Sequence, residues 1–448
     1  MRQQTKVKGT SMKMTLFTAG FLLAALAPTG PAPAADQAAA EVEDLPQITI
    51  TDPNRDLFRL ALPGAVGDAD LAAAATDIER RDLDLVGLFR LLNPESFPDS
   101  LLKEGLGFSS DLWSQVGAQG VAKLRATRET GGVALEGRLY QIGRGENAVL
   151  TKTYRGPEVR PLVHMWANDI IAQFTGMRGV FGSRIAFAMA GKTGEIATIG
   201  MDGQELKVVT QMKSECLLPA LSPSGGQIAF TSYLRGGADL WVVSASGGRA
   251  RRISDRPGMN TGAAWLPGGN ALVATLSFEG NPDLYKISAA DGKIIARLTD
   301  SHAADLSANL SPGGDQIAFV SDRQGTPQVY LMPSSGGGAR RLTFQGSYNQ
   351  TPRFSPRKDA PMIAFTGRDE RNVFDVFTYD LRAGRIERVT QGLGSNYDPA
   401  WSPDGRLLVY ASSRGGLFVK NLQTLKEFRI YKGGAKSPSW GPPPADSK

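Results

Sequence analysis

The sequence is poor in the residue types that form cross-links and metal sites. Cys216 is the only cysteine among 448 residues, and His164 and His302 are the only histidines. One cysteine cannot form an internal disulfide or a cysteine zinc site, and two histidines leave little material for a metal cluster or a Ser-His-Asp triad. We therefore expect no metal and no cofactor, with Cys216 serving as a core or loop thiol.

Catalytic and phosphate-binding motifs are missing as well. The chain contains no G-x-S-x-G nucleophile elbow, no H-E-x-x-H metalloprotease helix and no G-x-x-x-x-G-K-[ST] phosphate loop. Without a nucleophile beside a base, hydrolytic chemistry has no obvious residues to use. The sequence therefore predicts a protein that is not an enzyme.

Long apolar runs are scarce, and the clearest one lies at the N-terminus, over residues 16–27. Four basic residues precede it: Arg2, Lys6, Lys8 and Lys13. Small residues at positions 32–34 follow it, which is the layout of a secretory signal peptide. The run is too short to span a bilayer comfortably, which disfavours an uncleaved anchor. We predict a signal peptide over residues 1–34, cleavage between Ala34 and Ala35, and an exported protein that does not span a membrane.

The overall basic charge does not indicate nucleic-acid binding. The predicted signal peptide holds four of the 50 Lys and Arg residues and none of the 44 Asp and Glu residues, which leaves a mature net charge of +2. A net charge this small does not indicate the strongly basic surface that nucleic-acid binding requires. The pairs Arg251-Arg252 and Arg340-Arg341 occupy corresponding repeat positions, where we expect solvated outer strands.

The C-terminal half repeats a short phrase whose clearest copy, PAWSPDGRLLVY, covers residues 399–410. A large apolar residue occupies the same slot in every copy: Leu221, Trp265, Leu310, Phe354, Trp401 and, in a truncated last copy, Trp440. Successive slots lie about 44, 45, 44, 47 and 39 residues apart, within the roughly 40–50-residue period of four-stranded propeller blades. The repeat therefore predicts a β-propeller.

Each copy is expected to form four short strands separated by Gly and Pro turns. The first copy begins at residues 184–187 with a second strand and lacks a first one, whereas residues 437–440 form a first strand followed only by a Pro-rich tail over residues 441–448. One blade cannot bury both of its faces, so the blades must pack in a ring. The simplest closure gives an all-β six-bladed propeller over residues 184–440, locked by the C-terminal strand.

The region between the signal peptide and the propeller lacks the repeat and differs from it in predicted secondary structure. Residues 35–47 are rich in alanine and acidic residues and predict a flexible N-terminal arm, and residues 48–176 predict one α/β domain. The expected strands are 48–51, 57–61, 121–127, 133–140 and 149–154. The expected helices are 68–92, with Asp68 as cap, 109–116 and 157–175. A glycine-rich hinge over residues 177–183 separates the two domains. His164, in the last helix, is expected to pack or cap.

Propellers commonly act as rigid binding platforms through loops at the mouth of the central channel. The segment that enters each innermost strand should lie there. Four of these segments supply the candidate contact residues: Met259, Asn260, Thr261, Asp305, Leu306, Ser307, Tyr348, Asn349, Gln350, Asn396, Tyr397 and Asp398. Their mixture of amides, small residues and tyrosines suits protein recognition, although Asn and Asp could equally satisfy turn backbone.

Several of these features together resemble the TolB family of the Tol–Pal cell-envelope system. The export signal, the small α/β domain, the phrase FTGMRGVF at residues 174–181, the phrase RIAF at residues 184–187 and the six propeller repeats occur in the family's order. The loop at residues 346–350 is also similar to the family's loop before its fifth innermost strand. The resemblance covers nearly the whole mature chain.

The resemblance implies a non-enzymatic adaptor in the periplasm of a Gram-negative bacterium. Family members bind the peptidoglycan-associated lipoprotein Pal at the propeller mouth and the inner-membrane protein TolA through the N-terminal arm. By position, the mouth candidates above would contact Pal. The arm residues that would contact TolA are Ala35, Asp36, Glu41, Glu43, Asp44 and Leu45. Such a monomeric adaptor would maintain outer-membrane integrity and invagination during cell division, and other outer-membrane or periplasmic proteins are further candidate partners.

Two alternatives stay open from the residues alone. The chain could be a periplasmic propeller that binds a carbohydrate or another small ligand, or a non-catalytic relative of peptidase propellers. Peptidases of that kind need an additional α/β-hydrolase domain, for which we expect no room. A ligand site should concentrate aromatic and carboxylate residues in the channel, whereas the loops here are mixed. A cation held in the channel has no sequence signature.

Overall fold

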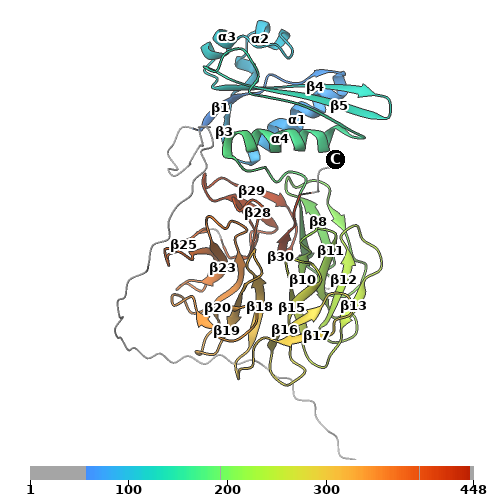
Figure 1. Ribbon diagram of the computed structural model, residues 1–448, viewed down its shortest axis with the longest axis vertical. Coiled ribbons are helices and arrows are strands. Elements are labelled where there is room, and N and C mark those ends of the chain that lie inside the picture. Colours follow the sequence, from blue (N-terminus) through green and yellow to red (C-terminus); the bar gives the residue numbers. More distant parts are fainter. Residues whose placement is uncertain (1–56, 192, 393, 444–448) are drawn as a thin grey trace, which may run out of the picture. The chain divides into compact units, whose positions relative to one another are not determined.

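The computed structural model describes residues 57–191, 193–392 and 394–443 (Figure 1). The predicted signal peptide, the N-terminal arm, the strand expected at residues 48–51 and the end of the Pro-rich tail lie outside these residues. The described chain contains an α/β domain followed by a six-bladed β-propeller, which confirms the predicted fold class.

The α/β domain is built on one mixed sheet with the strand order β3-β1-β4-β5-β6, and the short β2 pairs with β4. The strands are β1 (Phe58–Ala61), β2 (Val66–Gly67), β3 (Phe89–Leu91), β4 (Gly120–Glu129), β5 (Gly132–Gln141) and β6 (Leu150–Gly156). The strand β1 runs parallel to β3 and β4, and β4, β5 and β6 are antiparallel.

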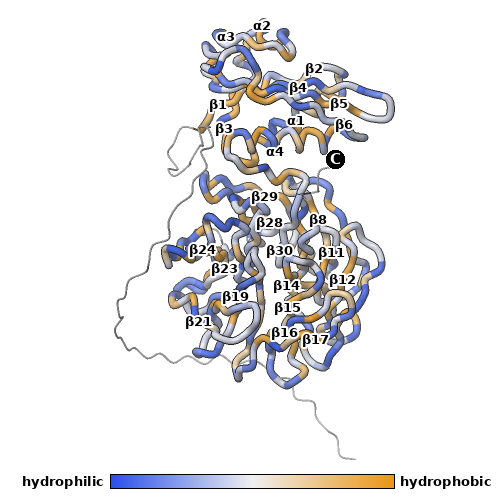
Figure 2. Tube along the Cα trace, viewed as in Figure 1, coloured by the Kyte–Doolittle hydropathy of each residue, from blue (hydrophilic) through white to orange (hydrophobic). Residues whose placement is uncertain are grey.

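Two long helices pack against each other and against this sheet: α1 (Ala69–Leu85) and α4 (Val159–Thr175). Shorter helices complete the domain: η1 (Pro94–Ser96), α2 (Asp99–Lys103) and α3 (Ser110–Gln115). The helix α4 ends where Gly176 takes a left-handed conformation with φ of 70° and donates its N–H to the carbonyl of Ala172, the usual glycine stop. In Figure 2 the apolar stretches (orange) follow the helices and inner strands.

The helix predicted over residues 68–92 is shorter than expected. It ends at Leu85, because Gly87 adopts a φ of 67° that breaks the helix, and the chain then forms β3 parallel to β1. Apolar residues at helical spacing continue through this break, which explains the error. Asp68 does precede the helix, but its carboxylate accepts the backbone N–H of Arg128 at 2.6 Å instead of capping.

The propeller consists of six four-stranded antiparallel sheets in the described residues. Blade 1 contains β30 (Ala435–Trp440), β7 (Arg184–Met189), β8 (Ile196–Gly200) and β9 (Lys207–Val208). Blade 2 contains β10 (Cys216–Leu221), β11 (Gln227–Ser232), β12 (Asp239–Ser244) and β13 (Arg251–Ser254). Blade 3 contains β14 (Asn260–Trp265), β15 (Ala271–Leu276), β16 (Asp283–Ser288) and β17 (Ile294–Arg297).

The other three blades follow the same order. Blade 4 contains β18 (Asp305–Leu310), β19 (Gln316–Ser321), β20 (Gln328–Pro333) and β21 (Arg340–Arg341). Blade 5 contains β22 (Asn349–Phe354), β23 (Met362–Arg368), β24 (Phe374–Asp380) and β25 (Ile386–Arg388). Blade 6 contains β26 (Asn396–Trp401), β27 (Leu407–Ser412), β28 (Leu417–Asn421) and β29 (Glu427–Tyr431).

The C-terminal strand closes the ring as predicted. In blade 1 the strand β30 pairs antiparallel with β7, with Ala435 opposite Met189 and Trp440 opposite Ile185. The indole of Trp440 also donates a hydrogen bond of 2.8 Å to the Ser183 hydroxyl. Closure covers the edge of β7, which would otherwise be exposed, and the remaining inner edges of the blades are short and face the channel.

All six innermost strands carry a β-bulge, which the sequence pattern did not predict. At each bulge the third residue of the strand has a positive φ between 49° and 63°: Leu218, Gly262, Ser307, Thr351, Asp398 and Ser437. Only one of these residues is glycine, so the other five hold a conformation that side chains disfavour. A bulge bends a strand and redirects its side chains, and here it does so at the same level around the channel.

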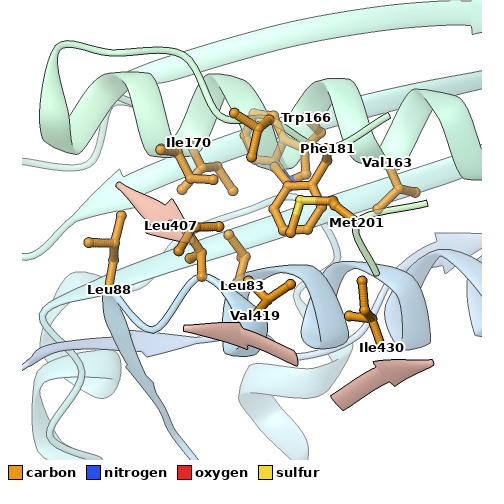
Figure 3. Close-up of a cluster of buried hydrophobic side chains, with 14 of the residues drawn as sticks. Leu83, Leu88, Val163, Trp166, Ile170, Phe181, Met201, Leu407, Val419 and Ile430 are labelled. Atoms are coloured by element: carbon orange, nitrogen blue, oxygen red, sulfur yellow. The ribbon is translucent and has the colours of Figure 1, made fainter. Parts of the chain in front are cut away.

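One hydrophobic cluster includes residues of both domains. Leu83 of α1 and Trp166 of α4 are fully buried in it together with Leu407 of β27 and Val419 of β28 (Figure 3). Met201, in the turn after β8, belongs to the same cluster. The α/β domain and blades 1 and 6 therefore share a continuous core.

Candidate functional site

The six innermost strands surround a central channel that contains a cavity of about 400 Å³. Its walls come from β10, β14, β18, β22, β26 and β30. Hydrogen bonds join neighbouring strands of this ring, among them Leu221 N–H to Ser439 Oγ (3.0 Å), Trp265 Nε1 to Ala220 O (2.8 Å), Phe354 N–H to Asn309 Oδ1 (2.8 Å) and Trp401 Nε1 to Arg353 O (2.9 Å). These bonds fix the channel wall, so a ligand meets a surface that is already formed.

The segments predicted as mouth loops include the first residues of the innermost strands themselves. Asn260, Asp305, Asn349 and Asn396 begin β14, β18, β22 and β26, and their side chains are at most 2% exposed. Burial of this degree keeps the four side chains from offering contact area to a partner. Their position is set by the bulge two residues later, which draws the start of each strand into the blade.

The buried polar residues brace the blades. The amide of Asn260 donates to the carbonyls of Ala238 (3.1 Å) and Arg256 (2.7 Å), and the Asp305 carboxylate accepts two hydrogen bonds from the guanidinium of Arg323 at 2.9 and 3.0 Å. Each pair satisfies groups that would otherwise be costly to bury. Asp and Asn at these positions therefore serve the turn backbone and the blade packing.

Hydrogen bonds between buried side chains also link neighbouring blades. Asn349 Nδ2 donates to Gln328 Oε1 at 2.8 Å, and Asn396 Nδ2 donates to Asp375 Oδ1 at 3.0 Å. Gln328 is the first residue of β20 and Asp375 the second residue of β24, the third strands of the preceding blades, and both are fully buried. These hydrogen bonds fix the ends of the strands that form the mouth.

The remaining candidates reach the solvent. Met259 is 37% exposed, and seven others are half-buried: Thr261, Leu306, Ser307, Tyr348, Gln350, Tyr397 and Asp398. Of the twelve predicted contact residues, four are therefore buried and stabilise the blades, and eight are accessible to a partner.

Aromatic rings gather at blades 5 and 6. The ring of Phe374 lies between Tyr348 and Tyr397, with centroid distances of 5.9 and 6.1 Å, and the guanidinium of Arg368 lies 5.5 Å from the Tyr348 ring. Tyrosine and arginine are the residue types that most often dominate binding energy at protein interfaces. We refer to Tyr348, Phe374, Tyr397 and Arg368 as the aromatic patch.

The sequence pattern did not predict every exposed apolar residue of the propeller. Phe374 begins β24 rather than an innermost strand, so the pattern of entry loops does not indicate it. Outside the aromatic patch, Phe344, at 72% exposure, lies in the connection between β21 and β22, and Leu234, at 42%, lies in the turn between β11 and β12. An isolated apolar residue in a polar turn was the available signal. Beside the patch, a pocket of about 410 Å³ is lined in part by Gly346, Arg368 and Phe377.

A second polar cluster lies between α1, α4 and the turn after β8. His164 Nδ1 is 2.6 Å from Asp82 Oδ2, its Nε2 is 3.9 Å from Asp202 Oδ2, and its ring stacks on Phe181. Burial raises the pKa of the Asp82 carboxyl, and the hydrogen bond with His164 opposes this effect. Asp82, His164 and Asp202 could together hold a metal ion, but Asp202 forms an ion pair with Arg160 that a metal would have to displace. The packing role expected for His164 agrees with these contacts.

Cys216 is fully buried, and burial raises the pKa of its thiol to about 11. A thiol with a high pKa is a weak nucleophile at neutral pH. This environment agrees with the expected core thiol. In the part of the chain that the structure describes, no helix is long and apolar enough to cross a membrane.

Comparisons with known proteins bear on both domains. The chain matches the model of the TolB amino-terminal domain over residues 46–148 and that of the TolB beta propeller domain over residues 171–443. It is 40% identical to the Tol-Pal system protein TolB of Anaeromyxobacter dehalogenans (strain 2CP-C) over 414 residues. This match covers 89% of this chain and 94% of the relative. It is 34% identical to a TolB homolog of Chlorobium luteolum over 61% of this chain and 63% of that protein.

A solved structure agrees in fold. TolB from Acinetobacter baumannii superposes on this chain with a TM-score of 0.77 and 23% sequence identity, over 86% of this chain and 97% of that one. The propeller model alone matches more than half of the chain, and the Anaeromyxobacter relative is similar along nearly all of it. This chain therefore belongs to the TolB family.

Proposed function

We propose that this chain is a periplasmic, non-enzymatic component of the Tol–Pal system that binds Pal at the propeller mouth and TolA through its N-terminal arm. Membership of the TolB family and the Tol–Pal name of the Anaeromyxobacter relative support the assignment to this system. The predicted signal peptide supports export. The role would be to maintain outer-membrane integrity and its invagination during division.

The observation that carries the Pal proposal is the aromatic patch at blades 5 and 6. Its rings are held by one another and by strand ends that the buried Asn349 and Asn396 anchor. A rigid patch loses little conformational freedom when it binds, which favours its use as an interface centre. The proposed contact residues are therefore the accessible ones: Met259, Thr261, Leu306, Ser307, Tyr348, Gln350, Tyr397 and Asp398, together with Phe374.

Calorimetric titration tests this proposal. Residues 35–448 are titrated with the soluble domain of Pal from the same organism, beside the double variant Tyr348→Ala plus Tyr397→Ala. We expect micromolar or tighter binding by the unaltered protein and a loss of at least about tenfold in the variant, because interface tyrosines often contribute more than 1 kcal/mol each. Ile295→Ala, an equally simple truncation of a 54% exposed residue on an outer strand, is the matched control and should bind normally.

Two outcomes would contradict the proposal. Absence of binding by folded protein would remove Pal as the partner, and undiminished binding by the double variant would move the interface away from the aromatic patch. For the arm, deletion of residues 35–47 should abolish binding of the periplasmic part of TolA while Pal still binds. Equal TolA binding with and without the arm would overturn that assignment.

A further inference from the structure

The fifth position of each innermost strand lies at one level of the channel, just beyond the bulge. The six residues at this position are Ala220, Ala264, Asn309, Arg353, Ala400 and Ser439. Five are small or neutral and one is an arginine. Among the described residues that line the cavity, Arg353 is the only one that carries a charge.

The Arg353 side chain has few partners in the described structure. Its recorded hydrogen bond is from Nη1 to the carbonyl of the preceding Pro352, at 2.9 Å, and no carboxylate of the described residues forms an ion pair with it. Burial lowers the pKa of Arg353, and the charge of Asp398 partly offsets this effect. Asp398 itself accepts hydrogen bonds from the Ser437 N–H and hydroxyl at 3.1 and 3.0 Å. Arginine stays protonated in proteins, so the channel holds a poorly compensated positive charge.

Further donors lie at the same level. Asn309 uses its Oδ1 to accept the Phe354 N–H, which leaves the Nδ2 group of this cavity-lining residue as a donor. Ser439 accepts the Leu221 N–H and keeps its hydroxyl proton for another acceptor. The wall also includes large apolar residues: Leu221, Trp265, Phe354, Trp401 and Trp440.

We propose that the propeller channel binds a small organic carboxylate, with Arg353 as its anchor. The planar guanidinium fork matches the two oxygens of a carboxylate, and Asn309 and Ser439 can donate to the same group. The aromatic and aliphatic wall suits a short carbon skeleton, and a cavity of about 400 Å³ is at the lower end of the size range of ligand pockets. This site is separate from the aromatic patch and does not depend on the Tol–Pal assignment.

Calorimetric titration of residues 35–448 with sodium benzoate tests the proposal, with benzyl alcohol as the uncharged counterpart. We expect saturable benzoate binding and no comparable binding of benzyl alcohol. Arg353→Ala should weaken benzoate binding by about tenfold or more, because hydrogen bonds to a charged group contribute roughly 1.5–3 kcal/mol. The exposed Arg235→Ala, in a turn of blade 2, is the matched control and should bind as the unaltered protein does.

The variant is designed to keep the fold. Alanine already occupies the equivalent position in three other innermost strands, at Ala220, Ala264 and Ala400. Unchanged thermal unfolding would confirm that Arg353→Ala is folded. Tryptophan fluorescence gives an independent signal, because Trp265, Trp401 and Trp440 line the cavity and should respond to an occupant.

The outcomes separate the two possible sources of the carboxylate. Benzoate binding that Arg353→Ala abolishes supports a site for a free carboxylate, whether or not Pal binds. Loss of Pal binding in Arg353→Ala without any benzoate binding would overturn this and assign Arg353 to an acidic group of the partner. Absence of benzoate binding, or equal binding by Arg353→Ala, would likewise overturn the proposal.

Discussion

At the scale of single residues, adjacent positions in β26 have different roles. The Asn396 side chain is 1% exposed and donates to Asp375, whereas Tyr397 is half-buried and joins the aromatic patch. A buried bracing residue should affect stability, and a surface aromatic residue should affect binding.

This difference predicts opposite phenotypes for two neighbouring substitutions. Asn396→Ala should destabilise the protein by about 1–3 kcal/mol, because it leaves the buried Asp375 carboxylate without one of its donors. Tyr397→Ala should change stability little and should weaken Pal binding. Urea unfolding and calorimetric titration of both variants check the prediction. A stable Asn396→Ala protein with weakened Pal binding would show that the asparagine contacts the partner after all.

The buried Glu79 should make the stability of the fold depend on pH. Glu79 of α1 is 1% exposed and accepts a hydrogen bond of 2.7 Å from the Trp166 indole, and burial raises its pKa to about 8. The folded state therefore holds a proton that the unfolded state releases above about pH 4.5. The stabilising effect of this proton is complete below that pH and is lost as the pH rises toward 8.

Glu79→Gln removes this dependence, because an amide has the shape of the neutral acid and its oxygen can still accept from Trp166. Between pH 5 and pH 8 the unaltered protein should lose stability relative to Glu79→Gln, by on the order of 3 kcal/mol. Urea unfolding of both proteins across this range measures the difference. A constant difference with pH would mean that Glu79 ionises normally in the folded state.

At the scale of elements, the propeller depends on one strand supplied from the far end of the chain. The strand β30 pairs with β7, its Trp440 indole donates to Ser183, and its Ser439 hydroxyl oxygen accepts the Leu221 N–H of blade 2. Without β30, blade 1 would expose the edge of β7 and the ring would open.

Truncation after Gly434 should therefore lower the melting temperature by about 10 °C or more, or give aggregated protein, because several kcal/mol of packing are lost together. Truncation after Pro443 is the matched control, since it keeps all of β30. Differential scanning calorimetry measures both proteins. Equal melting temperatures would show that the ring does not need the closing strand.

At the scale of the whole molecule, the shared core couples the two domains. Buried residues of α1 and α4 pack in one cluster with β27, β28 and the turn that holds Met201 (Figure 3). Polar contacts add to it: the amide of Asn421 donates to the Val86 carbonyl at 2.7 Å, and Lys426 pairs with Asp84 at 2.6 Å. Domains joined in this way should unfold together.

Met201→Asp should break this coupling, because it places an unpaired carboxylate in the shared core and leaves the propeller strands themselves unchanged. Calorimetry should show one unfolding transition for the unaltered protein and two separated transitions for the variant. Met259→Asp, at the exposed mouth, should keep the single transition. Two transitions in the unaltered protein would indicate that the domains are already independent.

The sequence by itself determined the architecture of the propeller. Repeat slots from Leu221 to Trp440 fixed the number of blades, and the missing first strand before Arg184 fixed the closure. The pattern of α4 and its stop at Gly176 were also readable. These features are local or periodic, so they can be predicted from the sequence without the tertiary contacts. Helix periodicity failed only after Leu85, where one glycine conformation and a parallel strand partner override the apolar spacing.

The roles of individual site residues depended on the tertiary structure. The bulges draw Asn260, Asn349 and Asn396 into the blades, and the same residue types would be surface contacts if the strands began later. The aromatic patch and the isolated charge of Arg353 arise only when blades that are distant in sequence close into a ring. The pairing and burial of a polar group depend on the residues around it. Ring closure determines which residues those are.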